Sequence, residues 1–145
     1  MFLGTYEYTI DPKGRLFIPA KLREQNGATQ NNFVITRGLE QCLYLYDKKS
    51  FHEVLSTRLT NLPVKNQQDA RAFKRLLLAG AHDVSLDDNG RLLIAKPLLE
   101  YAGFKKDISI LGVGERIELW SLQRWESYSR QAASTFKRMG KELEI

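Results

Sequence analysis

The sequence contains an internal repeat, and this repeat restricts the possible folds more than any other feature. Residues 9–24, TIDPKGRLFIPAKLRE, match residues 85–100, SLDDNGRLLIAKPLLE, at a shift of 76 positions. After a two-residue gap the match resumes at a shift of 74, with 44–51 aligned to 118–125. Each half has about 45 residues, which is too few to bury a stable core alone. We therefore expect the halves to interlock into one barrel with a pseudo-twofold axis, pairing strands between them.

Each half is expected to contain the same local elements. The predicted strands cover 5–10, 15–19, 32–38 and 42–47 in the first half, and 82–87, 91–95, 107–114 and 116–121 in the second. Asp at the first turn position and Gly at the fourth predict a type I turn after the first strand of each half. A helical turn follows the second strand, at 20–25 and 96–102. Gly27 and Gly103 are its expected C-caps, and Pro19 and Pro97 lie at its start.

The chain is predicted to divide into a first half, a helical linker, a second half and a C-terminal helix, at residues 5–50, 51–78, 79–122 and 123–145. The linker should hold two helices. One begins with a capping box at 50–53, and the other covers 67–80, with Gly80 at its end. The second linker helix has an apolar stripe of Ala72, Phe73, Leu76 and Leu77, and the C-terminal helix (122–140) has one of Leu122, Trp125, Ala132, Phe136 and Met139. The fold class is mainly β with flanking helices.

Composition excludes several functional classes. About 43% of the 145 residues are apolar, but no apolar run approaches the length of a membrane span, and no signal pattern stands at the N-terminus. Cys42 is the only cysteine, and His52 and His82 fit ordinary surface positions, so neither a disulfide nor a metal site is predicted. No hydrolase, metalloprotease or phosphate-loop motif occurs. We expect a cytoplasmic protein without a cofactor, a membrane partner or a small-molecule substrate.

The paired Asp-x-x-Gly-Arg turns carry the strongest functional signal. Asp11, Gly14, Asp87 and Gly90 are expected to shape the two loops. Arg15 has two interpretations: it holds the loop together with the nearby carboxylate, or that carboxylate orients it for bidentate bonding to phosphate or guanine. The net charge of +5 permits nucleic-acid binding without establishing it.

The two copies differ in charge. The second turn has Asn89 in place of Lys13 and an additional Asp88, and its following helix lacks a counterpart of Arg23. The basic face is therefore predicted in the first half, formed by Lys13, Arg15, Lys21, Arg23 and Arg37, with Arg91 as a weaker contact. Arg71, Lys74 and Arg75 share one face of the linker helix, which is either solvated or in contact with phosphates.

Three segments together resemble the MraZ family of bacterial proteins, which have two tandem SpoVT-AbrB-type units. They are MFLGTYEYTIDPKGRLFIPAKLREQ, ARAFKRLLLAGA and DDNGRLLIAKPLLEYAG. The resemblance covers nearly the whole chain. It implies a double-split, swapped-hairpin β-barrel with flanking helices, and a ring-like homo-oligomer. The family's paired Asp-x-x-x-Arg motifs fall on Asp11/Arg15 and Asp87/Arg91.

In function, the resemblance implies a nucleoid-associated transcriptional regulator that binds double-stranded DNA. Such proteins act at the promoter of the cell-division and cell-wall gene cluster that contains their own gene. A ring would repeat the Lys13/Arg15 tip around its rim. Repeated sites on the promoter DNA would be the natural target of these tips. The alternative is an antitoxin-like adaptor, because AbrB-type barrels also bind proteins. An enzyme would need a site that the sequence does not contain.

Overall fold

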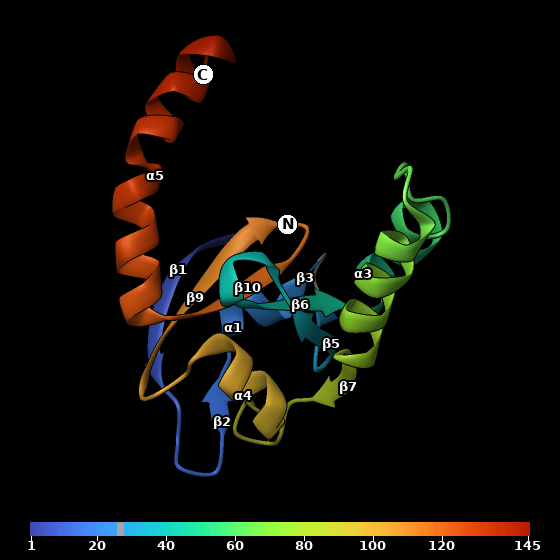
Figure 1. The fold of residues 1–145 in the computed structure, drawn as a ribbon. Coiled ribbons are helices and arrows are strands. Elements are labelled where there is room, and N and C mark those ends of the chain that lie inside the picture. The colour runs from blue at the N-terminus through green and yellow to red at the C-terminus, as the bar shows by residue number, and fades with distance from the viewer. Residues whose placement is uncertain (26–27) are drawn as a thin grey trace.

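A six-stranded antiparallel sheet organises the chain (Figure 1). The computed structural model describes residues 1–25 and 28–145. The strand order is β1-β9-β10-β6-β5-β7. The strands are β1 (Phe2–Thr9), β9 (Asp107–Gly114), β10 (Ile117–Ser121), β6 (Leu43–Asp47), β5 (Asn32–Arg37) and β7 (His82–Ser85).

Strands from the two halves are interleaved in this sheet, as the repeat predicts. The first strand of each half pairs with the other half: β1 with β9, and β7 with β5. The two halves also meet at the centre of the sheet, where β10 pairs with β6. The prediction of strand pairing between halves is confirmed. Hydrogen bonding among the described strands leaves the sheet open, with β1 and β7 at its edges.

A second, short ladder joins the halves outside the large sheet. Strand β2 (Arg15–Phe17) pairs antiparallel with β8 (Arg91–Leu93). The N–H of Ile18 donates to the carbonyl of Gly90 over 2.9 Å, and the N–H of Ile94 donates to that of Gly14 over 2.9 Å. Each half thus gives the other the same bond, as a pseudo-twofold arrangement requires. This ladder starts beside both Asp-x-x-Gly-Arg turns.

The hydrophobic core is shared by the two halves. Leu16 and Ile18 of the first half and Leu92 and Ile94 of the second are all buried in one cluster. Burial of aliphatic side chains is the main term that stabilises such a core. Because each half supplies only part of the cluster, neither half could form this core alone.

The short helices follow the predictions with one exception. Helix α4 (Lys96–Ala102) has Pro97 in its first turn and ends at Gly103 with φ 64°, as predicted. Helix α1 (Ala20–Arg23) begins directly after Pro19 but is shorter than predicted. The chain turns extended at Glu24, because β3 (Glu24–Gln25) pairs with β4 (Ala28–Thr29), a hairpin that local patterns did not reveal. The expected cap at Gly27 lies outside the described residues.

The first linker helix begins one turn earlier than predicted. Helix α2 (Lys48–Val54) has Asp47 as its N-cap, and a π-helical segment, η2 (Leu55–Leu59), continues it. The side chain of Asp47 accepts from the Ser50 N–H over 2.8 Å and from the Ser50 hydroxyl over 2.9 Å. The capping box at 50–53 was therefore wrong, because the carboxylate at the end of β6 reaches the free N–H groups first.

Helix α3 (Gln67–Ala79) ends at Gly80 as predicted, but its apolar stripe is not covered. Ala70 is the buried residue of this helix and Leu77 is half-buried. Phe73 and Leu76 remain 46% and 59% exposed. In the described part of the chain, one 3₁₀ turn, η1 (Leu39–Gln41), completes this side of the molecule.

Helix α5 (Leu122–Glu142) is two residues longer than predicted and projects away from the sheet (Figure 1). Its first turns are anchored where Trp125 and Tyr128 pack on Trp120, with ring centroids 5.4 and 4.9 Å away. Phe136, further along, is 83% exposed. No helix in the described ranges is both long enough and apolar enough to cross a membrane.

Candidate nucleic-acid interface

The β2–β8 ladder brings the two Asp-x-x-Gly-Arg turns to one edge of the molecule. Arg15 opposes Leu93 and Phe17 opposes Arg91 in this ladder. The two turns are 76 residues apart in the chain but become neighbours in space. The candidate site is thus a single surface made by both halves.

The backbone of the first turn is held by Asp11. Its Oδ1 accepts from the N–H groups of Lys13 and Arg15, both over 2.9 Å, and its carbonyl accepts from Gly14 N–H over 2.9 Å. Gly14 adopts φ 84°, a conformation that costs other residues about 1–2 kcal/mol. A side chain there would also meet the Ile94 carbonyl at 3.2 Å.

The backbone of the second turn repeats this arrangement. Asp87 Oδ1 accepts from Asn89 over 2.9 Å and from Arg91 over 3.0 Å, and Gly90 N–H donates to the Asp87 carbonyl over 3.0 Å. Gly90 has φ 74°. The pKa values of Asp11 and Asp87 lie below their ordinary value, chiefly because the N–H groups of Arg15 and Arg91 donate to the charged carboxylates.

The arginine side chains of the two turns make different contacts. Arg15 Nε lies 2.6 Å from Asp11 Oδ2, whereas Arg91 Nη1 points across the ladder to the same oxygen at 3.8 Å. Asp11 is thus shared by both arginines. Because only Nε of Arg15 is bonded, its two terminal nitrogens have no acceptor among the described residues and remain open to a ligand. About 38% of the Arg15 side chain is exposed.

The remaining predicted cations lie at different places. Lys13 is exposed at the tip of the first turn, and Lys21 is exposed on α1. Arg23 reaches from α1 toward the second turn: its guanidinium lies 5.8 Å from the Phe17 ring centroid. A side chain at Gly90 would come within 3.3 Å of that guanidinium. The second turn, which lacks its own counterpart of Arg23, therefore lies next to the Arg23 of the first half.

Arg37 is not part of this surface. Its guanidinium lies 5.3 Å from the Tyr101 ring centroid and lines a groove beside α3. The prediction that placed Arg37 on the basic face was wrong, because the antiparallel pairing of β5 with β7 sets Asn32 beside Ser85 and leaves Arg37 at the end of the strand away from the second turn. Repeat patterns alone do not show which end of the sheet a strand terminus occupies.

The cations of α3 are remote from the turns. Arg71 and Arg75 are exposed and Lys74 is half-buried. Figure 1 shows α3 on the side of the molecule away from the loop before β2. They form a separate surface from that of Arg15. Among the described residues, no group of three or more His, Cys, Asp and Glu side chains is placed to hold a metal ion.

Sequence reasoning missed two features of this site, the Arg91–Asp11 contact and the position of Arg23 beside Gly90. Both are contacts between the halves. The repeat could have predicted these two contacts. A pseudo-twofold axis that relates the two turns places residues of the first half next to the second turn, and residues of the second half next to the first turn.

Comparison with known proteins identifies the family of this chain. The family model described as "MraZ protein, putative antitoxin-like" matches residues 1–76 and again 77–142. The chain belongs to the MraZ family. The two matches meet between residues 76 and 77, so the family's repeating unit has the same spacing as the sequence repeat.

Individual MraZ proteins match over nearly the full length. The protein named "Transcriptional regulator MraZ" from Heliobacterium modesticaldum is 43% identical over 143 residues, covering 99% of this chain and 96% of the relative. That of Natranaerobius thermophilus is 40% identical with the same coverage. The Clostridium tetani protein is 43% identical over 129 residues, which cover 89% of this chain and 87% of its own. These relatives are named as regulators of transcription, not as enzymes.

Proposed function

We propose that this chain is a sequence-specific DNA-binding transcriptional regulator that acts as a ring-like homo-oligomer. Its proposed target is the promoter of the cell-division and cell-wall gene cluster that includes its own gene, and its place is the nucleoid in the cytoplasm. The proposed fold is the interleaved, double-split barrel of two SpoVT-AbrB-type halves, 5–50 and 79–122, joined by the linker 51–78 and followed by the helix 123–145. The names of the relatives support the regulatory role.

One observation carries the DNA-binding proposal: Asp11 holds Arg15 by Nε at 2.6 Å and leaves its terminal nitrogens open. An arginine braced in this way loses little freedom when it binds, and its planar pair of donors matches a phosphate or the major-groove edge of guanine. The turn geometry thus prepares Arg15 for a bidentate contact.

The other proposed contacts surround Arg15. Lys13 and Lys21 would neutralise phosphates beside it, and Arg23 and Arg91 would act at the second turn. Arg71, Lys74 and Arg75 would contribute only where DNA bends around the oligomer to reach α3. A single copy offers few cations, so we attribute useful affinity to several tips that bind one DNA segment together.

The adaptor hypothesis has one supporting observation, because the family description itself includes the term antitoxin-like. An antitoxin-like adaptor would bind a protein partner and would not require exposed cations at the turn. The adaptor hypothesis would be favoured if the wild type does not bind DNA and if an Arg15→Ala variant still binds a protein partner.

The test is Arg15→Ala, measured by gel-shift titration on DNA selected from a random pool by the wild-type protein. We expect affinity to fall about five- to 150-fold, since one bidentate contact contributes about 1–3 kcal/mol. The mass from light scattering should not change. The control is Arg130→Ala, which removes an exposed charge from α5. Equal affinity of Arg15→Ala and the control would refute the proposal.

A further inference from the structure

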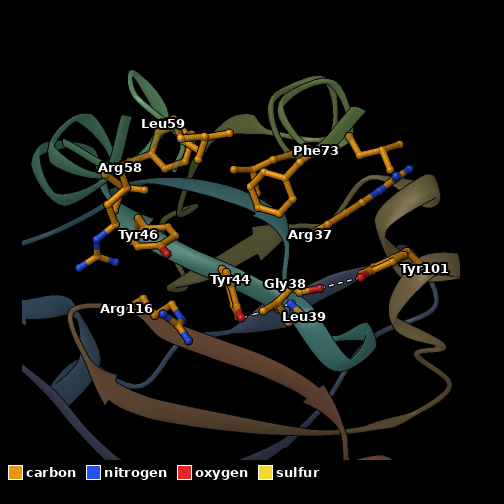
Figure 2. A pocket seen from close by; sticks show the side chains of 15 residues that line it. Arg37, Gly38, Leu39, Tyr44, Tyr46, Arg58, Leu59, Phe73, Tyr101 and Arg116 are labelled. Carbon is orange, nitrogen blue, oxygen red and sulfur yellow. Dashed lines mark hydrogen bonds between the residues drawn. The ribbon is translucent and has the colours of Figure 1, made fainter. Parts of the chain in front are cut away.

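An apolar groove lies beside α3, and Figure 2 shows the side chains that line it. Its volume is about 480 Å³, and it lies between η2 and α3 over strands β5 and β6. Apolar side chains dominate its lining, among them Tyr46, Phe51, Leu59, Phe73 and Leu76. Since Phe73 and Leu76 are 46% and 59% exposed, the groove is open to an occupant.

One cation in this groove has no counter-charge. Arg58 is bonded to Glu115 over 2.9 and 3.1 Å, and Arg116 to Glu118 over 2.7 Å. Arg37 has no carboxylate partner in the part of the chain that the structure describes, and its Nε is buried without an acceptor. The residue as a whole is half-buried, and its guanidinium lies 5.3 Å from the Tyr101 ring centroid at the groove wall. The groove therefore favours an apolar occupant that can also place a carboxylate beside the Arg37 guanidinium.

The distal half of α5 has an exposed apolar side that complements the groove. Residues 133–139 are all exposed, and Phe136, Met139 and Leu143 recur at helical spacing on one side. Phe136 is 83% exposed and Leu143 is 60% exposed. Glu142, which lies 3.5 Å from Arg138, and Glu144 lie at the end of the same segment, and the cations Lys137, Arg138 and Lys141 lie before them. A helix of this length without tertiary contacts is marginal in water, so this half needs a surface to cover it.

We propose that the distal half of α5, residues 132–143, binds in the groove of a second copy of this chain. Within one copy the two surfaces lie on opposite sides (Figure 1), so they meet only between copies. Phe136 and Met139 enter the apolar groove, and a glutamate near the helix end reaches Arg37. Because two different surfaces form the contact, the interface is heterologous, and repeating it closes a ring or extends a filament.

This inference rests on the homo-oligomer in the proposed function, but not on DNA binding. Its first test is the mass, by size exclusion with light scattering and without DNA, of two single variants. Phe136→Glu breaks the helix side and Phe73→Glu breaks the groove side. We expect each to fall from the wild-type assembly to the mass of one 16.7 kDa chain. Ser134→Glu, exposed on the opposite face of α5, should assemble normally.

Folding of each variant is checked by circular dichroism, and Leu76→Glu provides a second groove variant at a more exposed position. The decisive measurement mixes Phe136→Glu with Phe73→Glu at equal, high concentration. The first retains an intact groove and the second an intact helix, so the mixture should form a species of two chains and stop there. This outcome is specific to a heterologous contact.

Three results would overturn the inference: a monomeric wild type, no mixed species, or groove variants with the wild-type mass. The last result would mean that α5 pairs with another α5 and that the groove binds something else. Arg15→Ala should retain the wild-type mass. Loss of DNA binding by Arg15→Ala therefore does not contradict the proposed subunit interface. Failure of the interface variants to change mass does not contradict DNA binding by Arg15.

Discussion

The two Asp-x-x-Gly-Arg turns share one backbone design and differ in their side chains. In both, the aspartate accepts two N–H bonds at 2.9–3.0 Å and a glycine takes a positive φ. The first turn carries two cations and one carboxylate, and the second carries two carboxylates and one cation. Arg15 bonds its own aspartate, while Arg91 approaches the aspartate of the other turn. The two turns thus share the loop and differ in the charge that it carries.

This difference shows that the residues which shape the loop are not those which give the surrounding surface its charge. The loop depends on Asp11 or Asp87 and on a glycine, which act locally. The proposed DNA surface depends on the residues around them, and the first half supplies nearly all of its cations. The following predictions test that asymmetry.

The largest expected effect is the unequal loss on removing each arginine. Arg15→Ala should weaken DNA binding about five- to 150-fold, and Arg91→Ala by less than about threefold, because Asp87 and Asp88 repel phosphates near Arg91. Gel-shift titrations at one fixed salt concentration measure both. Equal losses would mean that the two turns contact DNA in the same way and that the asymmetry has no functional meaning.

A smaller gain is expected when the second turn is given the charge of the first. Asn89→Lys places a cation where the first turn has Lys13, and it should raise affinity about threefold at low salt and steepen the salt dependence by roughly one phosphate. Asn61→Lys adds the same charge at an exposed site in the linker and serves as the control. A gain of the same size in both variants would show only non-specific attraction.

The two aspartates should differ in their contribution to folding. Asp11→Ala removes two backbone bonds and the contacts with both arginines, whereas Asp87→Ala removes the two backbone bonds alone. Thermal unfolding should show Tm lowered by a few degrees for Asp11→Ala and by less for Asp87→Ala. Asp88→Ala, at an exposed position, should leave Tm unchanged. The opposite order would contradict the shared role of Asp11.

The smallest effect is expected in the acid range. The pKa values of Asp11 and Asp87 are lowered from 3.8 in the folded chain. A lowered folded pKa contributes stability above the unfolded pKa, and this contribution is lost as pH falls through the folded value. Between about pH 5 and about pH 2, Tm should fall more steeply for the wild type than for the Asp11→Asn/Asp87→Asn double variant. Parallel curves of Tm against pH would mean that Asp11 and Asp87 do not cause the loss of stability in acid.

Much of the fold could be predicted from local patterns. Pro97 and Gly103 set the limits of α4, Gly80 ends α3, and the repeat predicted that strands of the two halves pair. These predictions succeeded because proline and glycine act on backbone angles within a few residues. The site was predicted less completely. Its residue types were recognised, but Arg37 was misplaced and the contact of Arg91 with Asp11 was not foreseen.

The sequence by itself determined two turns of one design, their unequal charge and membership of the MraZ family. Only the tertiary structure decided that the turns meet across β2 and β8, that Asp11 receives two arginines, and that Phe73 and Phe136 remain exposed in one chain. The reason is physical. Turn chemistry depends on neighbours in the chain, whereas these contacts depend on the path of the whole chain between the halves.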